Sequence, residues 1–168
     1  MQIYLLILWS FLYVKPPVSL SGTVFYCMDC LDYYDECTPI CESECKTALL
    51  FLDDKTVLRE DHCWSDFSYR KGIYLIDNQK ITIQYEAKSI DYTPSDPSGK
   101  LIHQNTEQNF TESYQLEKCN GKTTLQLRSS SYDMFCSEMM ALSIDSLATY
   151  KSDLRQKGVA KFLGFESN

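Results

Sequence analysis

Residues that could act as general bases are scarce in this chain. Its 168 residues include only two histidines, His62 and His103. His62 adjoins Cys63, but neighbours in an extended segment point to opposite faces, and His103 has no obvious partner. The sequence has no G-x-S-x-G, H-E-x-x-H or P-loop motif. We therefore expect a protein that is not an enzyme and that needs no cofactor or metal.

Positive charge is also limited. Sixteen Lys and Arg residues stand against 23 Asp and Glu residues, which gives a formal net charge of −7. Nucleic acids and anionic membrane surfaces are bound chiefly through Lys and Arg. The composition therefore predicts no nucleic acid partner and no phosphoinositide membrane binding.

The sequence has one long apolar run, and it lies at the start of the chain. The run extends from Ile3 to Val14, the length of a signal-peptide core and too short for a bilayer, which needs about 20 residues. Pro16-Pro17 follows, and Ser19 and Ser21 supply small residues at the −3 and −1 positions of a cleavage site. We expect residues 1–21 to be a signal peptide and the protein to be secreted or to reside in a secretory-pathway lumen. An uncleaved anchor and a buried core segment are the alternatives.

Eight cysteines follow this leader, and five of them lie in CMDCLDYYDECTPICESEC. An even number in an oxidising compartment predicts four disulfides, although the sequence leaves their pairing open. Because five is odd, at least one of the five must pair with a later cysteine, which attaches this segment to the rest of the chain. A zinc site and a redox site built on the C-x-x-C pair are the alternatives. The predicted disulfide cysteines are Cys27, Cys30, Cys37, Cys41, Cys45, Cys63, Cys119 and Cys136.

Residues 22–45 are therefore predicted to form a cysteine-rich cap. Cys37, Cys41 and Cys45 are spaced by four and would share one face of a short helix. Tyrosines among acidic residues can form a protein-binding surface, because Tyr supplies a large contact area at small entropic cost. Packing around the disulfides is the alternative role. The candidate surface consists of Tyr26, Tyr33 and Tyr34.

Alternating apolar residues and turn residues predict an antiparallel β-meander after the cap. The clearest hairpin joins two strands through the turn Asp77-Asn78-Gln79, and a second is joined through Asn120-Gly121. Residues 88–99 are predicted to be a loop, and Asn109 is the acceptor of an N-glycosylation sequon. The predicted strands are 47–52, 68–76, 80–87, 100–104, 112–118 and 123–129.

A helix over about Tyr132–Lys157 is predicted to follow, ended by Gly158. Its predicted apolar side includes Cys136, Met140, Leu147, Tyr150 and Leu154. The predicted fold is α+β: a small antiparallel barrel with a long C-terminal helix over residues 46–158, behind the cap and followed by a tail over 159–168.

Two stretches of this domain resemble the pleckstrin-homology (PH) family. CWSDFSYRKGIYLIDNQKITIQYE (63–86) is similar to that family's second and third strands. SYQLEKCNGKTTLQLRSSSYDMFCSEMMAL (113–142) is similar to its last hairpin and the start of its helix. The resemblance spans residues 46–157 and implies a bent barrel of seven strands closed by a helix.

Some PH domains bind phosphoinositides through basic residues near the first hairpin. The matching positions here are Lys55, Arg59, Arg70 and Lys71, and acidic residues are interleaved with them. We expect these basic residues to form a mixed-charge, solvated surface instead.

Three functions are consistent with these features. The first is a secreted, disulfide-stabilised and non-enzymatic domain that binds another extracellular or lumenal protein. The second is a carrier of a small apolar or lipid ligand inside or beside the barrel. The third is a hydrolase of unrecognised type that uses acid pairs such as Asp53-Asp54 or Glu60-Asp61.

Overall fold

The computed structural model describes residues 18–27, 45–94, 96, 101–119, 121–131, 138–141 and 144–164. Nine strands and two helices lie within these residues. They are β1 (Val24–Cys27), β2 (Cys45–Phe51), β3 (Thr56–Cys63), β4 (Asp66–Asp77), β5 (Lys80–Tyr92), β6 (Ile102–Thr106), β7 (Phe110–Cys119), β8 (Lys122–Ser130), β9 (Glu138–Ala141), α2 (Ile144–Gln156) and α3 (Val159–Phe162).

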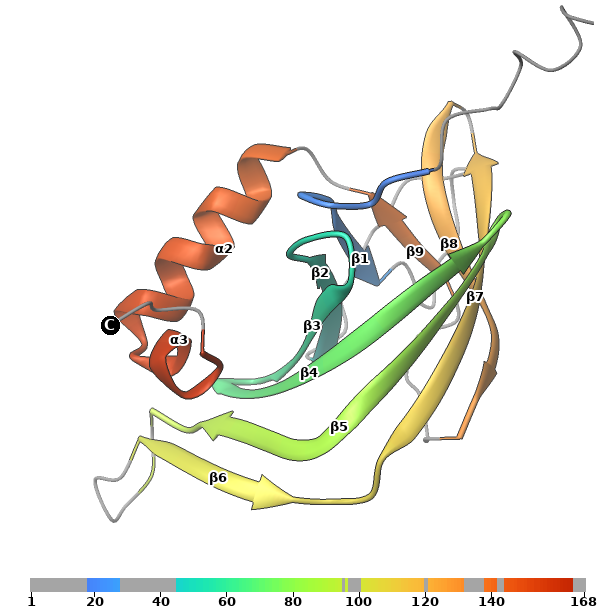
Figure 1. Cartoon of the computed structure of the whole chain (residues 1–168). Coiled ribbons are helices and arrows are strands. Elements are labelled where there is room, and N and C mark those ends of the chain that lie inside the picture. Colours follow the sequence, from blue (N-terminus) through green and yellow to red (C-terminus); the bar gives the residue numbers. More distant parts are fainter. Residues whose placement is uncertain are drawn as a thin grey trace, which may run out of the picture.

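The strands form one antiparallel sheet that curls into a barrel. Its order is β4-β3-β2-β1-β9-β8-β7-β5-β6, and an additional β4–β5 pairing joins the two sides (Figure 1). Strand β6 lies outside this ring, because among the described strands it pairs only with the last residues of β5. The predicted small antiparallel barrel with a C-terminal helix is therefore confirmed.

The two predicted hairpins are confirmed. Strands β4 and β5 pair from Asp77↔Lys80 onward, and Asn78 in their turn has a φ of 57°. Strands β7 and β8 pair up to Cys119↔Lys122, and Gly121 has a φ of 79°. Both turns contain a residue type that accepts positive φ, and both hairpins are flanked by alternating apolar residues.

The predicted loop over 88–99 is wrong for its first five residues. Strand β5 continues to Tyr92, and its last part pairs with β4 on one side and β6 on the other. Ser89 and Ile90 are buried there. The polar composition of this segment suggested a loop. The segment is a strand because its backbone pairs with neighbouring strands on both sides, which composition alone does not show.

The predicted start of the C-terminal helix is also wrong. Residues Glu138–Ala141 form β9, which pairs with both β1 and β8, and α2 begins only at Ile144. Met139 is thereby buried in the barrel, and Met140 is a strand residue. The helical spacing of Met140 with Leu147 and Leu154 was misleading, because β9 is short and completes the ring between two other strands. Cys136 lies outside the described residues.

The second half of the predicted helix is confirmed. Leu147 and Leu154 are buried together, and Tyr150 packs against the same cluster. Gly158 follows α2 with a φ of 71°, and its N–H donates to the carbonyl of Arg155 at 2.9 Å. Glycine adopts this left-handed conformation without the steric cost that a Cβ brings, so it ends the helix.

Two apolar clusters organise the molecule. The first fills the barrel interior with residues such as Phe51, Ile83 and Tyr114. The second lies between the outer face of β1–β3 and the two helices, where Leu50 and Leu58 meet Leu154. Figure 1 shows α2 and α3 beside the sheet. Among the described residues, no helix has the length and apolar character needed to cross a bilayer.

The segment before β1 packs into the barrel. Leu20 is 4% exposed and belongs to the interior cluster. The hydroxyl of Ser19 donates to Asp54 at 3.0 Å, and the N–H of Gly22 donates to the carbonyl of Phe51 at 2.8 Å. A mature chain that began at Gly22 would therefore lack one core side chain.

The predicted cap lies mostly outside the described residues. Its described part consists of 22–27, which includes β1, and of Cys45, which begins β2. The helix predicted over Cys37 and Cys41 therefore stays a prediction, except that its last residue, Cys45, belongs to a strand.

We expect Leu20→Ala to lower the free energy of unfolding by about 2–5 kcal/mol, because it leaves a cavity in the packed interior. Leu75→Ala is the matched control, since Leu75 is 75% exposed and exposed substitutions usually change stability by less than about 0.5 kcal/mol. Urea unfolding of the full chain measures both. A loss of unfolding free energy for Leu20→Ala as small as that for Leu75→Ala would show that Leu20 is not part of the core.

Candidate binding site in and at the mouth of the barrel

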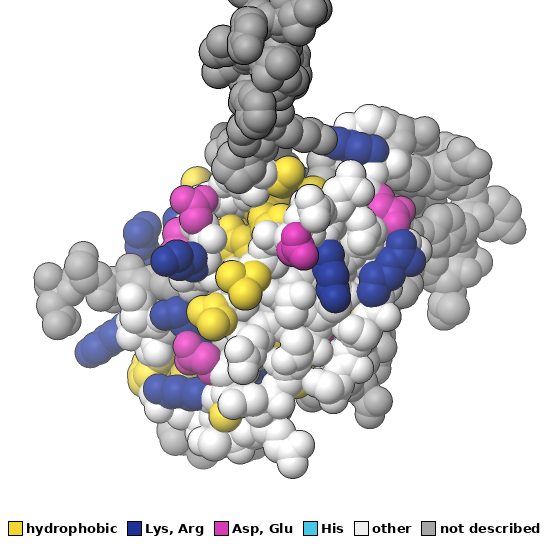
Figure 2. Space-filling model, turned by 45° about the vertical axis from the view of Figure 1, so that its right-hand side comes forward, with side chains coloured by type: hydrophobic (Ala, Val, Ile, Leu, Met, Phe, Trp, Pro, Cys, Tyr) yellow, Lys and Arg dark blue, Asp and Glu magenta, His cyan; other side chains and the backbone are white. Residues whose placement is uncertain are grey.

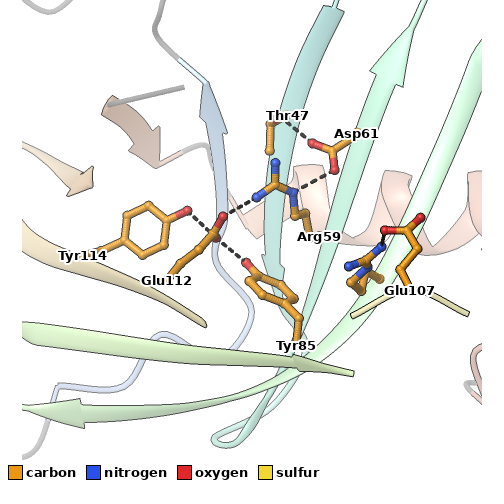
Figure 3. A network of polar contacts seen from close by, with 8 residues as sticks. Thr47, Arg59, Asp61, Tyr85, Glu107, Glu112 and Tyr114 are labelled. Atoms are coloured by element: carbon orange, nitrogen blue, oxygen red, sulfur yellow. Dashed lines mark hydrogen bonds and ion pairs between the residues drawn. The ribbon is translucent and has the colours of Figure 1, made fainter. Parts of the chain in front are cut away.

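A charged side chain lies inside the barrel. Alternation along β3 places Arg59 on the inner face, where it is 1% exposed. Its Nε donates to Asp61 at 2.7 Å, and its Nη1 pairs with Glu112 of β7 (Figure 3). Thr47 of β2 donates to the same Asp61 at 2.7 Å. Burial acts to lower the pKa of Arg59, but the two carboxylates raise it above its usual value, so the guanidinium stays charged.

Glu112 collects three donors in this interior. The hydroxyls of Tyr85 and Tyr114 donate to its Oε2 at 2.9 Å and 2.7 Å, and Arg59 donates to Oε1. Burial and then the neighbouring carboxylate raise the pKa of both tyrosines, so both keep the proton that they donate. A buried carboxylate with three donors is fully satisfied, as low-dielectric surroundings require.

A glycine lets Tyr85 take this position. Gly72 of β4 lies beside a register shift in the β4–β5 pairing. A Cβ at this position would meet the Tyr85 ring and the Gln84 carbonyl oxygen at 3.0 Å. Only glycine lets the ring lie this close to the β4 backbone, and the ring position directs the Tyr85 hydroxyl toward Glu112.

Aromatic contacts complete the interior cluster. Phe110 stacks on Tyr85 with ring centroids 4.4 Å apart. The guanidiniums of Arg59 and Arg70 lie 5.8 Å and 4.9 Å from the Phe110 centroid, which is cation–π range. Arg70 also pairs with Glu107. These contacts fill the barrel interior, so this part is a packed core.

Among the described residues, the opposite part of the barrel is left uncovered. A groove of about 1280 Å³ lies between the segment before β1, the β4–β5 turn and the β7–β8 hairpin. Leu20, Phe25, Ile76 and Leu116 are shared between this groove and the interior cluster, so the floor is apolar. The rim is polar and includes Asn78, Gln79, Gln115, Lys118 and Thr123.

A third feature lies on the outer face under α2. Glu60 is 4% exposed, and its Oε2 has no hydrogen-bond partner within the described part of the chain. Burial raises its pKa to about 7, against the opposing effect of Lys157. The ammonium of Lys157 lies 3.2 Å from the Phe67 centroid, donates to the Tyr69 hydroxyl at 3.1 Å and pairs with Asp153 at 2.7 Å.

The structure corrects the expected role of two basic residues. Arg59 and Arg70 were expected on a solvated surface, but both are buried. Lys55 is exposed and Lys71 is partly buried. The alternation of Val57, Arg59 and Asp61 along the strand could have indicated that Arg59 faces inward. It is difficult to recognise, because three consecutive charged residues, 59–61, are also typical of a solvent-exposed segment.

The remaining sequence candidates are spread over the molecule. Asn109 is exposed between β6 and β7, as a glycosylation acceptor requires. Tyr26 is partly buried, with its ring 6.2 Å from that of Tyr150, whereas Tyr33 and Tyr34 lie outside the described residues. His62 stacks on Phe67 at 3.9 Å, and His103 pairs with Asp96 at 2.7 Å.

The cysteines mostly lie beyond the described side chains. Cys63 is partly buried, and the backbones of Cys45 and Cys63 are directly opposite in the β2–β3 pairing. The predicted disulfides stay a prediction. Within the described residues, no three His, Cys, Asp or Glu side chains are grouped as a metal site would need.

Comparison with known proteins adds no relative. No family model, no curated protein and no solved structure matches this chain.

We expect Glu112→Gln to lower the free energy of unfolding by about 3–5 kcal/mol, because it leaves the buried Arg59 without half of its counter-charge. Glu117→Gln, on the same strand, is the control: Glu117 pairs with Arg128 at 2.6 Å on the exposed face, where a salt bridge contributes less than about 1 kcal/mol. Urea unfolding distinguishes the two. Similar losses of unfolding free energy in the two variants would show that the interior ion pair contributes no more than the exposed one.

Glu60 predicts a loss of stability as the pH rises. Its folded pKa of about 7 lies above the ordinary 4.5, so the folded state holds a proton that the unfolded state releases. The resulting loss in the free energy of unfolding is absent below pH 4.5, grows through pH 7 and then levels off at roughly 3 kcal/mol.

Glu60→Gln should remove this dependence, whereas the exposed Glu86→Gln should retain it. Unfolding free energies at pH 4.5 and pH 8 measure the effect. A native chain and a Glu60→Gln variant with parallel pH profiles would refute it.

Proposed function

We propose that this barrel binds a small molecule with an apolar body in the groove at its open mouth. The observation that carries the proposal is the composition of the groove: an apolar floor continuous with the core and a polar rim. Ligand sites in proteins commonly combine a concave apolar surface with a few polar groups that orient the ligand. The ring itself has eight strands, because β6 lies outside it. A barrel of eight strands is just wide enough to hold one small ligand or to be filled by side chains.

Within the described part of the barrel, the groove has room for a ligand, whereas the centre does not. The centre is occupied by Tyr85, Phe110 and Tyr114 together with Arg59 and Glu112, whose polar groups bond one another. A ligand would have to displace satisfied buried charges there, which is costly. At the mouth it would only cover Leu20, Phe25, Ile76 and Leu116.

The proposal includes the context that the sequence predicts. The carrier is secreted, keeps the segment from Val18 onward that lines the groove, has disulfides in a cysteine-rich cap, is glycosylated at Asn109 and performs no catalysis. A PH-like identity of the barrel is the finer form of the same proposal and rests on the sequence resemblance alone.

A second candidate function is binding of another protein, the first of the functions consistent with the sequence. Ile73 and Leu75 lie on the outer face of β4 and are 56% and 75% exposed. Figure 2 brings the right-hand side of Figure 1 forward and shows hydrophobic side chains between charged ones on that face. Two neighbouring exposed aliphatic side chains favour a protein contact.

Paired substitutions on β4 test the groove. Ile76 lines the groove, whereas Leu75 points outward. We expect Ile76→Gln to weaken binding of the neutral apolar fluorophore N-phenyl-1-naphthylamine at least tenfold, because it places an amide in the apolar floor. Leu75→Gln should leave the affinity unchanged.

Fluorescence titration measures both affinities, and thermal unfolding confirms that both variants fold. Native mass spectrometry of the purified chain should show a retained small molecule. Absence of saturable fluorophore binding, or equal weakening by the two substitutions, would reject the groove as the site.

A further inference from the structure

A second pocket lies on the outside of the barrel, between the helices and the sheet. It has a volume of about 330 Å³ and is separate from the groove at the mouth. We call it the basic pocket. Its lining comes from the β2–β3 turn, the start of β3, β4, the two helices and the residues just after α3. It consists of Leu52, Asp53, Thr56, Lys71, Lys151, Leu154, Arg155, Ala160 and Gly164.

Three cations and one acid line this pocket. Lys71 comes from β4, and Lys151 and Arg155 come from α2. The acid, Asp53, already accepts hydrogen bonds from the backbone N–H groups of Lys55 and Thr56 at 2.8 Å and 2.7 Å. Desolvation acts to raise its pKa, but these bonds and Lys71 lower it, so it stays ionised. The pocket therefore carries a net positive charge in a chain whose formal charge is −7.

The two helix cations lack counter-charges of their own. Neither Lys151 nor Arg155 forms an ion pair with any carboxylate in the described ranges, and the nearby Asp153 pairs with Lys157. Residues four apart lie on one face of a helix, and like charges at that spacing are destabilising. The helix dipole favours Arg155, which lies in the last turn. It does not explain Lys151, which lies one turn earlier.

We propose that the basic pocket binds the phosphate or sulfate group of a small organic ester. A guanidinium offers paired donors that match a tetrahedral oxyanion, and lysines add point charges. The pocket is larger than a bare oxyanion needs, and Leu52, Leu154 and Ala160 supply apolar surface for the ester carbons. The pocket shares no lining residue with the groove at the mouth, so this site is independent of the proposed carrier function.

Calorimetric titration of the full chain at low ionic strength tests this assignment. The probes are inorganic phosphate, inorganic sulfate, phenyl phosphate and acetate. We expect saturable binding of phenyl phosphate that is tighter than that of inorganic phosphate, that weakens with added salt and that exceeds binding of acetate.

The variant Lys151→Gln/Arg155→Gln should weaken binding of phenyl phosphate at least tenfold. Its control is Lys80→Gln/Lys88→Gln, which removes the same charge from two exposed positions on β5. The single variant Arg155→Gln, at an exposed position, serves if the double variant does not fold, and should weaken binding at least threefold. Fluorophore binding in the groove should be the same in all of these variants.

Three results would overturn the assignment. The first is no saturable heat with any of the phosphorus or sulfur anions. The second is an equal loss in the control variant, which would indicate a general charge effect. The third is phosphate binding with no gain from the phenyl group, which would leave no role for the apolar surface.

Discussion

The ion pair between Arg59 and Glu112 is the interaction on which the barrel depends. It joins β3 to β7 across the interior, and the hydroxyl of Tyr85 adds β5 to the same carboxylate. A buried pair of this kind costs much desolvation, so it tolerates only an arrangement in which each polar atom has a partner. That requirement fixes the register of three strands more strictly than apolar packing would, because a shift by one residue would turn Arg59 out of the barrel.

This constraint divides the barrel into two parts with different properties. Around Arg59 and Phe110 the interior is closed by charge and aromatic stacking, whereas around Leu20 and Leu116 apolar side chains continue to an open mouth. The closed part anchors the strands that shape the open part. A groove on a rigid base keeps its form without a ligand, and less ordering free energy is then lost on binding.

Local patterns predicted the parts of the fold that local interactions specify. The β4–β5 and β7–β8 hairpins follow from alternation and turn residues such as Asn78 and Gly121, and Gly158 marks the end of α2. Strand β9 could not be predicted, because four residues with helical spacing become a strand only through pairing with β1 and β8. Arg59 was misplaced for a similar reason: its counter-charge Glu112 lies 53 residues away in the sequence. The groove also combines three segments that are distant in the chain.

Strand β6 lies at the edge of the sheet, and the N-glycosylation sequon at Asn109 lies close to this edge in the sequence. One side of Ile102–Thr106 pairs with β5, and the sheet order of the described strands stops there. Such a free edge exposes backbone donors and acceptors that can recruit a strand from another molecule. Asn109 stands exposed three residues beyond this strand. A bulky, hydrated sugar chain at that position would obstruct the approach of a second sheet. Glycosylation there would therefore hinder aggregation through this edge.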